Sequence, residues 1–106
     1  MRIAIMQLEF IDLNLRKITD DIENHFRMEF EITSLYRIGD HGVHGQIPLR
    51  GLDLGCKNVI IGNEVCRYVN LNWVYDSDRP EMECAIYHEG DDWHLHLQTH
   101  PNTRRR

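Results

Sequence analysis

Two histidines stand two residues apart in the segment Trp93-His94-Leu95-His96-Leu97. Alternate residues of a β-strand point to the same side, so a strand here would present His94 and His96 together. The apolar residues around them would face the opposite side, toward a core. The segment therefore predicts a strand with one apolar face and one face that can bind a metal ion or move protons.

Two further residues of metal-ligand type precede this pair: His44 in a glycine-rich stretch, and Asp53 between two leucines. A carboxylate in so apolar a run needs a partner, which is either a metal ion or an arginine such as Arg37 or Arg50. One aspartate and two histidines suit zinc with its fourth position open, so we expect a Zn²⁺ site of the catalytic type. The competing interpretation is a pair of half-exposed strand histidines that bind nothing.

Helical periodicity predicts two of the elements that must position these residues. Apolar residues at spacings of three and four predict one helix over residues 13–26 and another within residues 59–73. In the second segment Asn63 is a suitable N-cap, so we expect this helix to start near Glu64.

The other segments predict a loop and several strands. Four glycines and a proline make residues 39–51 a loop. The order of the elements favours an α+β fold, with a small, mostly antiparallel sheet and two helices on one side. The last two predicted strands form an antiparallel hairpin. Strands are expected over residues 30–36, 52–54, 83–88 and 93–99.

Length and composition describe an ordinary globular domain. The 106 residues suit one domain, which we expect over residues 1–103, with residues 104–106 as a frayed, solvated basic tail. A net charge of -5 argues against nucleic-acid binding. Three cysteines without metal-ligand spacing are expected to be reduced thiols. Polar residues interrupt the N-terminal apolar stretch, so we expect no signal peptide, no membrane span and a cytoplasmic location.

Four segments follow one another in an order that matches a known enzyme family. They are Thr33-Ser34-Leu35-Tyr36-Arg37, His44, Arg50-Gly51-Leu52-Asp53-Leu54 and His94-Leu95-His96. In this order they resemble the motifs of the D-alanyl-D-alanine metallopeptidases, which share a superfamily with lysostaphin-type peptidases and the hedgehog signalling domain. The resemblance runs from about residue 32 to residue 100. It implies the hedgehog/DD-peptidase fold and zinc-dependent cleavage of peptides of the bacterial cell wall (peptidoglycan).

The resemblance also implies roles for individual residues. By position, His44, Asp53 and His96 would be the zinc ligands. His94 would lie beside the metal as a proton-transfer group, and Arg37 would face the substrate carboxylate or the developing oxyanion. Zinc would lower the pKa of a water molecule to about 7 and so make hydroxide available. The small size and the lack of a leader favour a phage-encoded protein, released at lysis or carried on a virion.

Two features differ from the family's pattern. The interval from His44 to Asp53 is longer than usual, which makes His41 a competing ligand. Many members have a catalytic glutamate shortly before the last ligand histidine, where this chain has Trp93. The general base is then one of four nearby residues: Glu89, Asp91, Asp92 or His94.

Two other classes of function stay open from the residues alone. One is a non-catalytic zinc-binding module, in which the metal serves stability or partner binding. The other is a metal-free structural or assembly protein, in which Arg37 forms an ion pair with Asp40 or Asp53. Metal content separates the metal-free protein from the other two classes. Hydrolysis of a muropeptide separates the peptidase from the zinc module. The sequence leaves the oligomeric state open.

Overall fold

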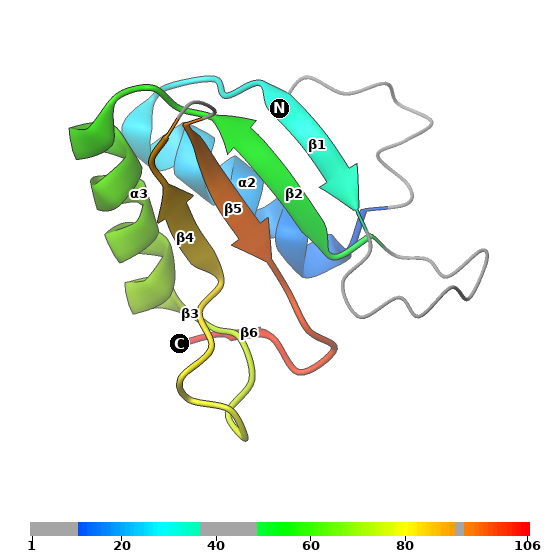
Figure 1. Cartoon of the computed structure of the whole chain (residues 1–106). Helices are drawn as coiled ribbons and strands as arrows, with labels where there is room; N and C mark the ends of the chain where they lie inside the picture. The colour runs from blue at the N-terminus through cyan, green and yellow to red at the C-terminus, as the bar shows by residue number, and fades with distance from the viewer. Residues whose placement is uncertain (1–10, 37–48, 91–92) are drawn as a thin grey trace.

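A computed structural model describes residues 11–36, 49–90 and 93–106 of the chain. Within these ranges the chain forms two α-helices and six β-strands (Figure 1). The helices are α2 (Leu13–Phe26) and α3 (Val59–Asn72). The strands are β1 (Ile32–Tyr36), β2 (Gly51–Gly55), β3 (Trp73–Val74), β4 (Ala85–His88), β5 (His94–Gln98) and β6 (Arg104–Arg105).

Four of these strands form an antiparallel sheet in the order β1-β2-β5-β4. The strands β4 and β5 make the predicted hairpin at one edge of this sheet. In this register Asp53 of β2 lies opposite His96 of β5, and His94 of β5 lies opposite His88 of β4. The predicted α+β class, with two helices and a mostly antiparallel sheet, is confirmed.

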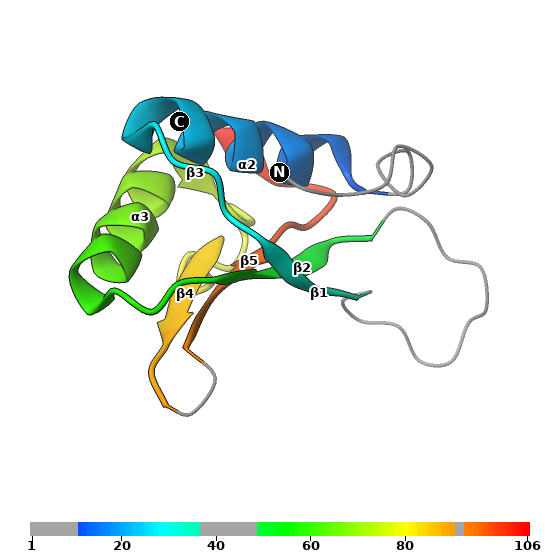
Figure 2. The same cartoon turned by 90° about the horizontal axis from the view of Figure 1, so that it is seen from above.

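The core lies between the sheet and the two helices. The helix α2 crosses one face of the sheet and α3 packs beside β4 (Figure 2). Four leucines of β2 and β5 are fully buried in one cluster with the apolar residues of both helices. Because strand residues alternate between faces, this burial turns Asp53, His94 and His96 to the other face of the sheet. The four leucines are Leu52, Leu54, Leu95 and Leu97.

The side chain of Asp12 joins the first helix to the sheet. Its Oδ2 accepts a hydrogen bond from the backbone N–H of Leu15 at 3.2 Å, which caps α2. The same oxygen accepts a hydrogen bond from the Thr99 hydroxyl at 3.0 Å, just after β5. The Nε atom of Arg50 lies 3.8 Å from Asp12 Oδ1. Arg50, one of the two arginines considered as partners for Asp53, therefore forms an ion pair with Asp12.

The second helix begins five residues earlier than expected. Asn58, and not Asn63, is its N-cap: the Asn58 Oδ1 accepts hydrogen bonds from the N–H groups of Ile60 and Ile61 at 3.0 and 3.2 Å. Two N–H groups that have no partner within the helix are thereby satisfied. The residues before Asn63 are apolar and belong to the helix, so Asn63 lies inside the helix and not at its start.

The prediction of a frayed basic tail is wrong. Arg104–Arg105 form the strand β6, which pairs with Trp73–Val74 of β3. The Arg105 guanidinium donates a hydrogen bond to Asp21 Oδ2 at 2.9 Å, and its Cζ lies 5.4 Å from the centre of the Trp73 ring. An ion pair, a cation–π contact and backbone pairing together order this charged end of the chain.

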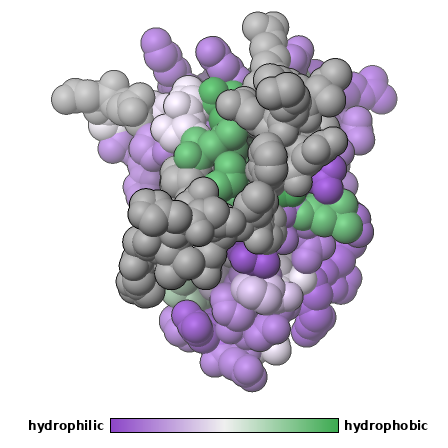
Figure 3. Space-filling model, turned by 90° about the vertical axis from the view of Figure 1, so that its right-hand side faces the viewer, coloured by the Kyte–Doolittle hydropathy of each residue, from purple (hydrophilic) through white to green (hydrophobic). Residues whose placement is uncertain are grey.

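On the β1 side of the molecule, most of the described residues that can be seen are hydrophilic, with smaller hydrophobic areas among them (Figure 3). Across the described part of the chain, the exposed large apolar side chains are few and separated along the sequence: Leu13, Met28, Ile60, Leu71 and Ile86. Scattered apolar side chains of this kind are normal on a globular domain.

Gly62 is a position at which α3 packs tightly against Tyr87 of β4. A Cβ added there would lie 2.4 Å from the Tyr87 ring, which packs against the glycine. The Tyr87 hydroxyl donates a hydrogen bond to the backbone O of Cys56 at 2.7 Å, so the ring cannot swing away without losing this bond. The close packing of α3 on β4 therefore depends on a glycine at this point.

We expect Gly62→Ala to destabilise the fold, because overpacking of this kind costs about 1–3 kcal/mol. This outweighs the gain of about 1 kcal/mol that alanine gives over glycine within a helix. Urea unfolding followed by circular dichroism measures the change. Gly55→Ala is the matched control, since a Cβ there meets Thr33 at an ordinary 3.5 Å. An unchanged or raised urea midpoint for Gly62→Ala would contradict this account of the packing.

Candidate metal centre

The exposed face of the sheet carries a row of polar side chains that crosses three strands. Asp53 comes from β2, His94, His96 and Gln98 from β5, and His88 from β4. The predicted juxtaposition of Asp53 with the two histidines of β5 is therefore present. The leucines on the opposite face hold β2 and β5 in register, and this register aligns the polar row.

The Asp53 carboxylate lies between two imidazoles. Its Oδ1 is 3.1 Å from His96 Nδ1, and its Oδ2 is 3.8 Å from His94 Nε2. The three side chains are partly buried, with exposed fractions of 16% for Asp53, 14% for His96 and 23% for His94. The three side chains are thus partly shielded from solvent and still in contact with it.

The amide of Gln98 fixes what the other nitrogen of His96 faces. Gln98 Nε2 donates a hydrogen bond to the backbone O of Glu83 at 2.7 Å. Its Oε1 therefore points at His96 Nε2, 3.1 Å away. Gln98 is itself buried, with 7% of its surface exposed. Since Oε1 is only an acceptor, this contact is favourable when His96 Nε2 carries a proton.

This arrangement leaves a question of charge between His96 and Asp53. A neutral imidazole has one N–H and one lone pair. If the N–H points at Gln98, the lone pair of Nδ1 faces the negatively charged carboxylate oxygen across 3.1 Å, which is repulsive. In the other tautomer the lone pair of Nε2 faces Gln98 Oε1, which is repulsive in the same way. A second ring proton or a cation between Nδ1 and Oδ1 would remove this repulsion.

A zinc ion fits the donor set at this position. A nitrogen and an oxygen that share a tetrahedral zinc, each about 2.0 Å from it, are about 3.3 Å apart. The pair expected to share the ion, His96 Nδ1 and Asp53 Oδ1, is 3.1 Å apart, close to this value. A histidine that binds metal usually donates its other N–H to a neighbouring acceptor, which is the position of Gln98 Oε1.

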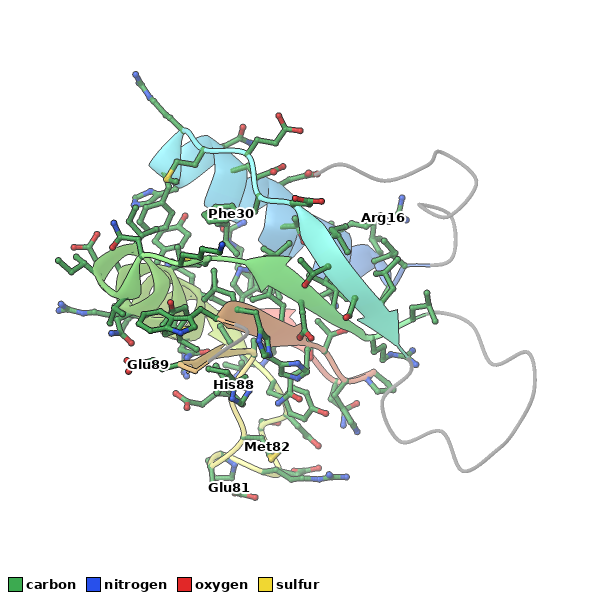
Figure 4. The ribbon with its side chains drawn as sticks, turned by 45° about the horizontal axis from the view of Figure 1, so that its top comes forward. Arg16, Phe30, Glu81, Met82, His88 and Glu89 are labelled. Carbon is green, nitrogen blue, oxygen red and sulfur yellow. The ribbon has the colours of Figure 1, made fainter. Side chains whose placement is uncertain are left out.

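Several of the residues expected at the site are not among those described. Arg37, His41 and His44 lie outside the described residues, as do Asp91 and Asp92. Glu89 is described; it lies in the turn after β4 next to His88 and is exposed (Figure 4). Within residues 11–36, 49–90 and 93–106, no group of three or more His, Cys, Asp or Glu side chains is arranged to hold a metal ion.

Two further residues of this face, Gln98 and His88, are not among the predicted zinc ligands or catalytic groups. Gln98 stands two residues after His96, so the strand alternation places it on the polar face, but its orientation depends on the Glu83 backbone of another segment. The ring of His88 lies 4.9 Å from that of His94 and 6.2 Å from that of His96, measured between ring centres. Register across the hairpin, and not spacing along one strand, brings His88 to the site.

The three cysteines are free. Burial raises the pKa of the Cys66 and Cys84 thiols to about 12 and also raises that of Cys56. At neutral pH these groups are protonated thiols, and a thiol in this form is neither a nucleophile nor a zinc ligand. The oxygen and nitrogen donors of the polar face are therefore the better candidates for chemistry.

Comparisons with protein-family models, with curated proteins and with solved structures find no match for this chain. Neither helix of the described part of the chain is both long and apolar enough to cross a membrane.

Proposed function

We propose that this chain is a small zinc-dependent peptidase-like domain of the D-alanyl-D-alanine metallopeptidase type, which acts on peptides of the bacterial cell wall. Zinc would be held by His44, Asp53 and His96. The observation that carries the proposal is the contact of His96 with Asp53 on one side and Gln98 on the other. Its hydrogen-bond chemistry calls for a positive charge between His96 and Asp53.

The described residues are consistent with this ligand set. Two of the three proposed ligands, Asp53 and His96, lie side by side on neighbouring strands. Because the third, His44, lies outside the described residues, a group of three ligands is not expected among them. The α+β class is common to many functions and supports the hedgehog/DD-peptidase fold only in a general way.

The chain's own residues would divide the work of hydrolysis. A bound zinc ion would supply Lewis acidity and lower the pKa of water. Asp53 and His96 would hold the ion, and Gln98 would orient the His96 ring through its Nε2–H. His94, whose Nε2 lies 3.8 Å from Asp53 Oδ2, would move a proton between water and the leaving amine.

Two further groups would act on the substrate side. Arg37 has a permanent charge and a fork of N–H donors, which suits a substrate carboxylate or an oxyanion. The exposed position of Glu89 in the turn after β4 makes it accessible as a base at the edge of the polar face. His94 is the better candidate among the described residues, because its ring lies beside Asp53 and His96.

Metal content and hydrolysis together test the proposal. Protein purified without chelator is expected to contain one zinc per chain by elemental analysis, and to release D-alanine from, or cleave, a purified muropeptide. Asp53→Ala is expected to lose both properties, and His25→Ala, which changes an exposed imidazole of α2, is expected to keep both. Protein with no zinc that cannot be restored by added Zn²⁺ would overturn the proposal. Zinc without hydrolysis would overturn the peptidase assignment in favour of the zinc module.

A further inference from the structure

His88 belongs to the polar face, but the proposed reaction does not use it. It lies at the end of β4 and pairs with His94 across the hairpin. The two ring centres are 4.9 Å apart and the ring planes are tilted by 32°. His88 is exposed, and His94 keeps 23% of its surface exposed. Two imidazoles therefore face each other where an ion from solvent can reach them.

The separation of the rings matches that of two imidazoles on one metal ion. With a metal–nitrogen distance of about 2.0 Å and a tetrahedral angle, the ring centres of two such ligands lie about 5 Å apart. The observed 4.9 Å is close to this value. The register of the hairpin brings the two rings together, since His88 and His94 are direct partners on neighbouring strands. Small side-chain rotations would then suffice to direct one nitrogen of each ring at a shared ion.

We infer that His88 and His94 form a second binding site, for a late first-row divalent cation such as Zn²⁺, next to the proposed catalytic zinc. Imidazole nitrogens select such ions over Mg²⁺ or Ca²⁺, which prefer oxygen ligands. The Asp53 carboxylate, 3.8 Å from His94 Nε2, adds a favourable negative charge. With two protein ligands the ion completes its coordination with water, so it exchanges readily and is not a structural metal.

Occupation of this site has a consequence for the proposed reaction, and this part rests on the proposed function. A cation on His94 takes up the lone pair that the ring needs to accept a proton. Zinc in excess of one equivalent would therefore inhibit hydrolysis. The reaction would be fastest when only the first site is filled.

Calorimetric titration of the full chain with Zn²⁺ alone tests the inference without any activity measurement. We expect two binding events, of which the weaker depends on His88. In His88→Gln the affinity of the weaker event should fall by at least about 10- to 100-fold. This is the usual loss when a group that only supports a metal ligand is removed, so the loss of a ligand itself should be no smaller. The stronger event should be unchanged. His25→Gln is the control, because it also removes an exposed imidazole. The ring of His25 stacks on Tyr68 and not on another histidine.

The outcomes separate this inference from the proposed function. A His88-dependent event without a stronger event supports the second site and contradicts the proposed zinc peptidase. One strong event with no His88-dependent event supports the proposed function and overturns the second site. Equal losses in His88→Gln and His25→Gln also overturn it, since the effect would then follow from histidine content alone. Circular dichroism of each variant establishes that the fold is retained.

Discussion

Replacement of His96 by alanine is expected to abolish the binding of zinc and the stability that zinc confers. His96 is the described residue whose Nδ1 lies 3.1 Å from the Asp53 carboxylate, so it is the nitrogen best placed to share an ion with that group. A ligand present at about 1,000 times its dissociation constant stabilises the native state by about 4 kcal/mol. The wild-type melting temperature should therefore rise on addition of Zn²⁺, and that of His96→Ala should not.

Replacement of Gln98, the partner of His96 on its other side, should weaken zinc binding without abolishing it. Gln98→Ala removes the acceptor that orients the imidazole but leaves all three proposed ligands unchanged. Loss of such an outer-shell partner costs about 10- to 100-fold in metal affinity. We expect Gln98→Ala to bind zinc in this weakened range, between the wild type and His96→Ala. His25→Ala should match the wild type in both zinc affinity and zinc-dependent melting.

A different result would point to a direct contact in place of a shared metal ion. If chelation leaves the melting temperature of the wild type unchanged, and no zinc is found, then His96 and Asp53 interact directly across the 3.1 Å between Nδ1 and Oδ1. In that case His96→Ala destabilises the protein in the absence of any metal, because it leaves a partly buried carboxylate without that partner. The comparison of melting with and without chelator therefore distinguishes the two explanations of the same geometry.

Local patterns in the sequence accounted for most of the elements that build the site. The helix over residues 13–26 and the β4–β5 hairpin were predicted, because hydrophobic periodicity and turn composition act over a few residues. The alternation around His94 and His96 also predicted which side of β5 is polar. These properties depend on near neighbours in the chain, so they can be read from one sequence.

Features that depend on contacts between distant segments were not predictable in this way. The strand β6 is held in place by contacts of Arg105 with two distant residues. One is Asp21, 84 residues earlier in the chain, and the other is Trp73. The Gln98 amide is oriented by the Glu83 carbonyl across the hairpin, and no property of Gln98 itself indicates this. The start of α3 was misplaced because two asparagines five residues apart could each cap a helix, and only the N–H groups they meet decide between them.

His94→Ala is expected to keep zinc but to lower the rate of muropeptide hydrolysis by about 100-fold or more, the range for loss of a general acid–base group. The separation of the two roles follows from geometry. His96 Nδ1 approaches Asp53 to 3.1 Å, whereas His94 Nε2 stays 3.8 Å from the other carboxylate oxygen. His94 is also the more exposed of the two, with 23% against 14%. It is therefore better placed to meet substrate and water.

Zinc analysis and hydrolysis rates for both single variants check this assignment, with His25→Ala as the control that should alter neither. Loss of zinc in His94→Ala and its retention in His96→Ala would reverse the two roles. The ion would then lie between His94 and Asp53, and His96 with Gln98 would form a neighbouring hydrogen-bonded pair. If both variants keep zinc and an unchanged rate, the histidine pair of β5 is not the site. Asp53 would then belong to a polar cluster with the two imidazoles, because the exposed face of an antiparallel sheet accepts such a cluster without any catalytic role.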